Sequence, residues 1–136
     1  SSGGVVYGEP EDRPIEETRA KAPASPYGVT KLAGELYLDY YRIVQGTPSV
    51  SLRYSNVYGP RQNPHGEAGV VAIFSSQAMH GRPLMVYGDG EQTRDYVYVK
   101  DVARANLMAS TLELEDTGRN IVLEVTGEDR RFHLDP

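Results

Sequence analysis

The 136-residue chain contains no cysteine and no tryptophan. The lack of cysteine excludes disulfide bonds and cysteine-ligated zinc within it. No apolar run approaches the roughly 20 residues that a membrane-spanning helix needs, and the chain does not begin with the charged-then-apolar order of a signal peptide. We therefore expect a cytoplasmic protein that has no membrane partner.

Positive charge is also scarce. Lysine and arginine together number 14 against 19 aspartate and glutamate residues, which gives a net charge of -5, and the basic residues are scattered along the chain. Binding to a phosphate backbone needs a basic patch or stripe, so we expect no nucleic-acid partner. The three histidines, His65, His80 and His133, lack the spacing of metal ligands, and we expect no metal site.

The chain begins without a methionine, and residues 1–8 (SSGGVVYG) have the pattern of a buried strand end that runs into a loop. A start in the middle of an element indicates a fragment of a longer protein. We therefore expect the chain to be the C-terminal part of such a protein.

Helix and strand patterns alternate along the sequence. Ser25 and Pro26 are typical of a helix start, and Gly46 is typical of a helix stop. Asp101 is expected to cap a later helix. We predict loops over residues 9–24 and 55–64, helices over residues 25–44, 69–80 and 101–114, and strands over residues 1–8, 50–54, 84–87, 96–99 and 120–125. This order predicts an α/β fold with a parallel sheet.

Tyr27 and Lys31 lie four residues apart on the first predicted helix and therefore project from the same face. An ammonium group beside a phenol stabilises the phenolate, which allows the phenol to act as a base near neutral pH. The same spacing is equally typical of a surface lysine beside a half-buried tyrosine. From the spacing alone, we favour this second interpretation.

Four ordered motifs resemble those of the extended short-chain dehydrogenase/reductase family, in particular its NAD-dependent epimerases and dehydratases. They are VYG at 6–8, SPYGVTK at 25–31, LRYSNVYGPR at 52–61 and VYGDGEQTRDYVYVKD at 86–101. The resemblance implies the C-terminal part of a Rossmann-like parallel sheet plus most of a small substrate-binding α/β region. Residues 1–58 would belong to the NAD-binding domain, and residues 59–136 to a nucleotide-sugar-binding region that is incomplete at its C-terminus.

The resemblance also implies a cofactor, NAD, and a role for the residues that would contact it. Tyr27 would be the acid/base that takes a proton from the sugar hydroxyl, and Lys31 would hold the nicotinamide ribose and lower the Tyr27 pKa. Tyr54 would also lie against the cofactor. For Arg53, an ion-pair role and a functional role remain equally open.

The implied substrate is a UDP-sugar. Asn56 would contact the sugar or its phosphate, and the guanidinium fork of Arg94 would pair with the diphosphate. Backbone N–H groups at Gly69 and Val70, at the start of the second predicted helix, would bind the same diphosphate. Val86 and Tyr87 would border the uracil ring.

The first residues bear on the type of reaction. The catalytic Ser or Thr of the family falls on Gly3 here, so Ser1 or Ser2 would have to supply the hydroxyl, and we favour Ser2. The 4,6-dehydratases of the family carry Thr-Asp-Glu before VYG, because elimination of water needs an acid and a base. The chain has Gly3, Gly4 and Val5 at these places, which favours an epimerase.

The resemblance thus implies a UDP-sugar 4-epimerase that uses NAD and that forms a homodimer through its first helix when complete. The dinucleotide-binding fingerprint of the family is missing from these 136 residues, so we expect the isolated chain to be inactive. The alternatives are a non-catalytic remnant that only binds nucleotide sugars, and a dehydratase or reductase of the same family.

Overall fold

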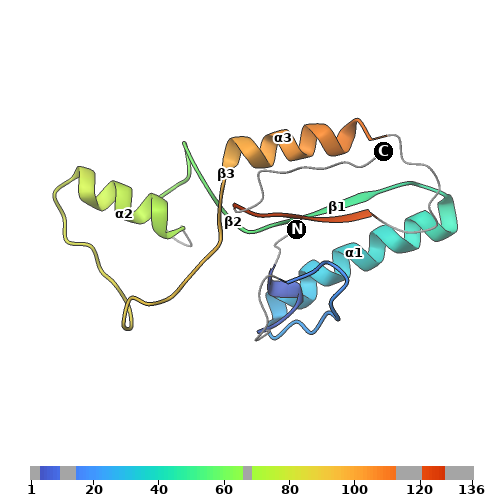
Figure 1. The fold of residues 1–136 in the computed structure, drawn as a ribbon, viewed down its shortest axis with the longest axis horizontal. Coiled ribbons are helices and arrows are strands. Elements are labelled where there is room, and N and C mark those ends of the chain that lie inside the picture. Colours follow the sequence, from blue (N-terminus) through green and yellow to red (C-terminus); the bar gives the residue numbers. More distant parts are fainter. Residues whose placement is uncertain (1–3, 10–14, 66–68, 113–120, 128–136) are drawn as a thin grey trace.

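The computed structural model describes residues 4–9, 15–65, 69–112 and 121–127. Helices and strands of one α/β fold alternate through these ranges, and Figure 1 shows their arrangement. In chain order the elements are the 3₁₀ helix η1 (Gly4–Val6), α1 (Pro26–Gln45), β1 (Val50–Tyr54), β2 (Asn56–Tyr58), α2 (Val70–Met79), β3 (Tyr96–Tyr98), α3 (Val99–Ser110) and β4 (Ile121–Val125).

Two parallel strand pairs form the centre of the fold. β1 pairs with β4 in a register that places Leu52 opposite Leu123, and β2 pairs with β3 so that Val57 lies opposite Val97. α3 follows one side of the β1–β4 pair and α1 follows the other (Figure 1). The α/β class with parallel strands that the sequence predicts is confirmed.

The chain changes strand partner between β1 and β2. The Ser55 backbone N–H donates to the Val125 carbonyl of β4, whereas the next N–H, that of Asn56, donates to the Asp95 carbonyl before β3. The carboxyl ends of β1 and β4 therefore meet the start of β2 at one place. In open parallel sheets, ligands characteristically bind beyond the carboxyl ends of the strands, where neighbouring connections diverge.

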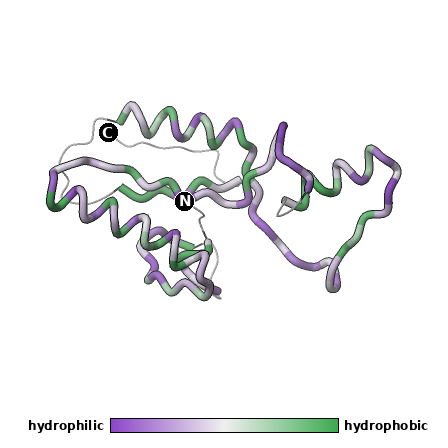
Figure 2. The backbone as a smooth tube through the Cα atoms, turned by 180° about the vertical axis from the view of Figure 1, so that it is seen from behind, coloured by the Kyte–Doolittle hydropathy of each residue, from purple (hydrophilic) through white to green (hydrophobic). Residues whose placement is uncertain are grey.

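A small hydrophobic core joins α3 to both strand pairs. Hydrophobic and hydrophilic residues alternate along this helix (Figure 2), and its inward positions Val102 and Ala105 are buried against three strand residues. These three are Leu52, Val97 and Val125. Leu107 of the same helix is 66% exposed, because it lies on the opposite side of the helix from Val102 and Ala105.

Local signals determine both ends of α1. The Ser25 Oγ atom accepts from the Gly28 N–H, Pro26 occupies the first turn, and Gly46 ends the helix in the left-handed conformation at a φ of 66°. Only Gly28 and Glu35 of this helix are buried. Apolar residues that recur at helical spacing along it, such as Leu36 at 61%, are largely exposed.

Several predicted elements are corrected by the structure. Residues 4–6 form a 3₁₀ helix and not a strand end, and the predicted loop 55–64 contains β2. Residues 84–87 form no strand, because no described segment pairs with them, and their side chains are exposed. β4 lies within predicted strand 120–125, of which residue 120 falls outside the described ranges.

The start of the third helix also differs from the prediction. α3 begins at Val99, directly after β3, so that Asp101 lies in its first turn and is not its N-cap. There its carboxylate still interacts favourably with the helix dipole. The helix ends at Ser110, and the predicted extension to residue 114 passes out of the described ranges after residue 112. None of the helices in the described parts of the chain has the length and apolar character needed to cross a bilayer.

Candidate functional site

Tyr27 and Lys31 lie side by side on the first two turns of α1. The Lys31 ammonium nitrogen is 5.2 Å from the centre of the Tyr27 ring, close enough for a cation–π contact. The Tyr27 side chain is 52% exposed, so a bound molecule could reach its hydroxyl. The predicted pair is therefore formed, and it faces solvent.

A separate pocket of about 490 Å³ lies at the point where the chain changes strand partner, between β2, the start of β3 and the N-terminus of α2. This volume is within the usual range of small-molecule sites. The pocket wall brings together Tyr54, Ser55, Asn56, Val57, Tyr58, Gln62, Gly69, Val70, Val71, Arg94 and Tyr96. Five of the residues that the sequence assigned to ligand binding are in this set: Tyr54, Asn56, Gly69, Val70 and Arg94.

The polar groups of this wall are held by the backbone around Asp95. The Asn56 side-chain amide donates to the Asp95 carbonyl at 3.0 Å, and the Asp95 carboxylate accepts from the Gly127 N–H at 2.9 Å. The neighbouring Arg94 donates to the Thr93 carbonyl at 2.7 Å and is exposed. These bonds join Asn56 and Arg94 to one loop, at the end of β4.

Other polar atoms of the wall lack partners. Ser55 Oγ and Gln62 Oε1 are buried and have no hydrogen-bond partner among the residues that the structure describes. At the start of α2, Gly69 provides no side-chain cap for the first backbone N–H groups of the helix. Such groups at a helix N-terminus favour anions. An anionic ligand could accept hydrogen bonds from the Ser55 hydroxyl and from these N–H groups, whereas Gln62 Oε1 needs a donor such as a sugar hydroxyl.

The remaining predicted residues lie elsewhere. Val86 and Tyr87 are 55% and 82% exposed on the segment between α2 and β3, and they do not line the pocket. Tyr27 and Lys31 do not line it either. Ser2 and Gly3 are outside the described residues. Among the described residues, no three His, Asp or Glu side chains gather closely enough to hold a metal ion.

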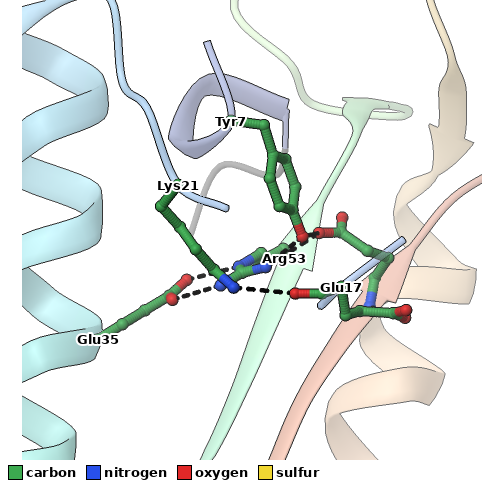
Figure 3. Close-up of polar contacts among 6 residues, drawn as sticks. Tyr7, Glu17, Lys21, Glu35 and Arg53 are labelled. Carbon is green, nitrogen blue, oxygen red and sulfur yellow. Dashed lines mark hydrogen bonds and ion pairs between the residues drawn. The ribbon is translucent and has the colours of Figure 1, made fainter. Parts of the chain in front are cut away.

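A buried polar network that was not predicted from the sequence lies between α1 and the β1–β4 pair (Figure 3). The Arg53 side chain is fully shielded from solvent, and its Nε and Nη2 atoms donate to the two Glu35 carboxylate oxygens at 2.7 and 2.6 Å. Its Nη1 atom donates to the Tyr7 hydroxyl, which in turn donates to the Glu124 carboxylate at 2.7 Å. One side chain of β1 thus joins η1, α1 and β4.

Exposed neighbours close this network on its outer side. The Lys21 ammonium donates to the Glu17 carbonyl at 2.9 Å and lies 5.8 Å from the centre of the Tyr7 ring. The Glu17 carboxylate accepts from the Glu124 N–H at 3.3 Å. Segment 15–24, predicted as a surface loop, is therefore attached to β4.

Burial and charge set the protonation states in the network. Burial raises the pKa of the Tyr7 phenol far above its usual range, and the hydrogen bond to Glu124 raises it further. Burial opposes the charge of Arg53, but the hydrogen bonds and charge of Glu35 outweigh this effect and raise the Arg53 pKa. Burial also raises the pKa of Glu124, against the opposing effects of the Tyr7 hydrogen bond and the Arg53 charge.

The ion-pair interpretation of Arg53, one of two left open from the sequence, agrees with this geometry. No local signal identifies its partner, because Glu35 lies four positions after Lys31, a spacing that predicts a pair between those two residues instead. Nothing local in the sequence indicates that Tyr7 and Glu124, 117 positions apart, would meet.

Comparison with known proteins identifies relatives over nearly the whole chain. The model of the NAD dependent epimerase/dehydratase family matches residues 1–123. The UDP-glucose 4-epimerase of Mycolicibacterium smegmatis is 52% identical over 109 residues, which are 80% of this chain and 35% of that protein.

Solved structures of proteins from the same family also superpose on this chain. The crystal structure of the Thermotoga maritima UDP-glucose 4-epimerase with UDP-glucose superposes with a TM-score of 0.84 at 47% identity, over 93% of this chain and 40% of that one. The Thermus thermophilus UDP-glucose 4-epimerase complex with NAD gives a TM-score of 0.79 at 46% identity, with the same coverage. The chain therefore spans well under half the length of these relatives.

Proposed function

Because the chain belongs to the NAD dependent epimerase/dehydratase family, we propose that the polypeptide containing it is an NAD-dependent UDP-sugar 4-epimerase, with UDP-glucose as the first substrate to test. The observation that carries the proposal is the pocket at the strand switch, whose wall includes Asn56, Gly69, Val70 and Arg94. The names of the relatives, UDP-glucose 4-epimerases, support the same reaction.

The pocket suits the diphosphate part of a nucleotide sugar. In the proposal, the Arg94 guanidinium pairs with phosphate oxygens, and the first backbone N–H groups of α2 at Gly69 and Val70 bind the same charge. The Ser55 hydroxyl is then available to donate to a remaining phosphate oxygen, and Gln62 Oε1 and the Asn56 side-chain oxygen can accept from hydroxyl groups of the sugar. Val86 and Tyr87 would approach the uracil ring from the segment before β3.

Tyr27 and Lys31 fit a dinucleotide, because an exposed phenol and a partly exposed ammonium group lie side by side at the start of α1. Tyr54 would complete the cofactor contacts. When bound, NAD would supply a hydride acceptor that can return the hydride to the sugar carbon. Lys31 would hold the ribose hydroxyls, and its charge would stabilise the Tyr27 phenolate.

The residues of the chain then supply proton transfer and orientation. The Tyr27 phenolate oxygen takes the proton of the sugar C4 hydroxyl while C4 is oxidised, and it returns the proton after the keto-sugar has rotated in the pocket. Ser2, whose place is outside the described residues, is proposed to hydrogen-bond the same oxygen. The division at residue 58, the homodimer and the cytoplasmic location belong to the same proposal and stay predictions.

The proposal is tested on the native polypeptide that contains this sequence, purified from its source. We expect an intact mass more than twice 15.0 kDa, bound NAD, and interconversion of UDP-glucose and UDP-galactose. Replacing Tyr27 with Phe should lower kcat by about 10²–10⁴-fold, as expected for loss of a general acid/base. Tyr37→Phe, which changes an exposed tyrosine of the same helix, is the matched control.

Separate titrations with UDP-glucose and with NAD distinguish the alternative. A polypeptide that binds UDP-glucose but neither binds NAD nor interconverts the sugars would contradict the proposal and identify a non-catalytic binding remnant. Conversion of UDP-glucose to a 4-keto-6-deoxy product would instead identify a dehydratase.

A further inference from the structure

We propose that the buried Arg53–Glu35 pair positions Tyr27 and Lys31 by fixing the rotation of α1 about its own axis; this inference rests on the proposed function. Neither residue is proposed to touch the substrate or the cofactor. Their role is to hold the helix that presents the reacting side chains.

Within the residues that the structure describes, α1 is attached to the other elements of this chain at few points. Of its 20 residues only Gly28 and Glu35 are buried. They are seven positions apart, or about two turns, and so lie on the same face of the helix. The described residues of this chain bury no other face of the helix: Leu36, Tyr40 and Ile43 are all more than half exposed, on the helix through which the homodimer is predicted to form.

The two attachments differ in kind: one is a close backbone contact, and the other is an ion pair. At Gly28, a Cβ atom would lie 2.5 Å from the Val5 carbonyl oxygen, so η1 approaches the helix backbone directly. At Glu35, both carboxylate oxygens accept from the planar Arg53 guanidinium. A two-point ion pair of this kind specifies direction as well as distance.

The two attachments lie close to the reacting side chains on the same helix. Lys31 lies one turn from Glu35, and Tyr27 lies one turn further, so both are offset from the buried face by less than about a third of a turn. A small rotation of α1 would therefore move the Tyr27 oxygen sideways. A misplacement of about 1 Å at a reacting group can cost on the order of 10²-fold in rate.

The Arg53–Glu35 pair is rigid because Arg53 is itself held in place. Arg53 is itself held by β1, which is paired with β4, and its third nitrogen contacts the Tyr7 hydroxyl of the segment that also touches Gly28. The same residue, Arg53, thereby fixes both attachments of α1. Figure 3 shows Tyr7 and Glu35 reaching the guanidinium from different elements.

The test uses the native polypeptide carrying Glu35→Gln, which removes the charge but keeps the side-chain shape. We expect kcat for UDP-glucose to fall at least 10-fold while KM changes less than about threefold, because the substrate pocket is built on other elements. Asp39→Asn is the matched control, since its carboxylate lies on the same helix and pairs with Arg42 of that helix. It should leave kcat unchanged.

A second control separates positioning from loss of stability. Val102→Ala removes core volume on α3 at a residue that does not itself line the pocket and is not on α1, and should lower the melting temperature without lowering kcat. If Glu35→Gln lowers kcat no more than a Val102→Ala variant of equal melting temperature, the proposal is wrong. Should Glu35→Gln fail to fold, Arg53→Lys retains the charge but loses the fork, and the same comparison applies.

A measurement without catalysis keeps the two proposals distinguishable. Spin labels on cysteines introduced at Val29 of α1 and Arg104 of α3, both exposed, report the placement of the helix. We expect a broader or shifted distance distribution in Glu35→Gln and no change in Asp39→Asn. An unchanged distribution overturns the positioning proposal whether or not the polypeptide is an epimerase. An inactive wild type overturns the proposed function, and the positioning of α1 is then decided by the distances.

Discussion

Gly28 on α1 and Val5 on η1 are in contact through their backbones: a Cβ atom on residue 28 would lie 2.5 Å from the Val5 carbonyl oxygen. Backbone atoms cannot move aside as a flexible side chain can. The contact brings the VYG segment at 6–8 against the helix turn that carries Tyr27. Two of the sequence motifs, far apart in the chain, are therefore one structural unit.

We predict that Gly28→Ala destabilises the protein although alanine is the better helix former. The gain in helix propensity is about 1 kcal/mol, whereas overpacking against a backbone carbonyl typically costs about 1–3 kcal/mol. Thermal or urea denaturation of the variant measures the difference.

Gly34 provides the control on the same helix. No atom lies within 4 Å of a Cβ atom placed there, and the residue is exposed. Gly34→Ala should therefore stabilise the protein by about 0.5–1 kcal/mol. Equal effects of the two substitutions would contradict the close contact at Gly28.

A second prediction concerns the buried ion pair. Arg53→Met leaves the Glu35 carboxylate buried without its partner, so we expect a loss of about 3–5 kcal/mol in the free energy of unfolding. The double variant Arg53→Met with Glu35→Met removes both charges and should recover most of this loss. A double-mutant cycle by chemical denaturation tests this, and additive effects of the two substitutions would show that the pair is not coupled.

The helix α1 and the strand β1 could be predicted from the sequence because their signals are local. Ser25, Pro26 and Gly46 each act within one turn of the helix end that they determine. β2 was missed because it is only three residues long and is defined by pairing with β3, some 40 positions later. Residues 84–87 failed as a strand for the complementary reason, since an apolar run forms a strand only where a partner is available.

The candidate site, like the fold, contains residues that could be predicted from the sequence and residues that could not. The positions of Asn56 and Arg94 could be assigned from motifs, and the structure brings both to one pocket. Gln62 and Ser55 of the same wall carry no signal of their own, because their importance lies in buried atoms without partners. The Tyr7–Glu124 contact depends on the complete path of the chain, which no short motif encodes.

A third prediction concerns pH. Burial raises the pKa of Glu124 above its ordinary value of 4.5, so the folded state binds this proton more tightly than the unfolded state does. The stability due to this group is fully present below pH 4.5 and is lost as the pH rises through the folded pKa. Glu124→Gln cannot ionise, so its stability relative to the wild type should increase between pH 4 and pH 8.

Urea denaturation of both proteins across this range provides the measurement. Neither Tyr7 nor Arg53 changes its protonation state in this window, because the pKa of each is raised further above it, so the phenol stays neutral and the guanidinium stays charged. The difference between the two proteins therefore isolates the carboxyl group. A difference that falls as the pH rises would mean that the Arg53 charge outweighs burial at Glu124.

The last prediction concerns Arg94, whose exposed guanidinium lies on the pocket wall. It donates one hydrogen bond, to the Thr93 carbonyl. Arg94→Lys keeps the charge but replaces a planar fork by a point charge, so we expect binding of UDP to weaken about 10-fold and to become more sensitive to salt. Arg104→Lys, an exposed arginine on α3 outside the pocket, should change nothing. Calorimetric titration with UDP at two salt concentrations measures both variants. Equal affinities for wild type and Arg94→Lys would mean that the diphosphate does not bind to this side chain, and would move the search to the backbone N–H groups at the start of α2.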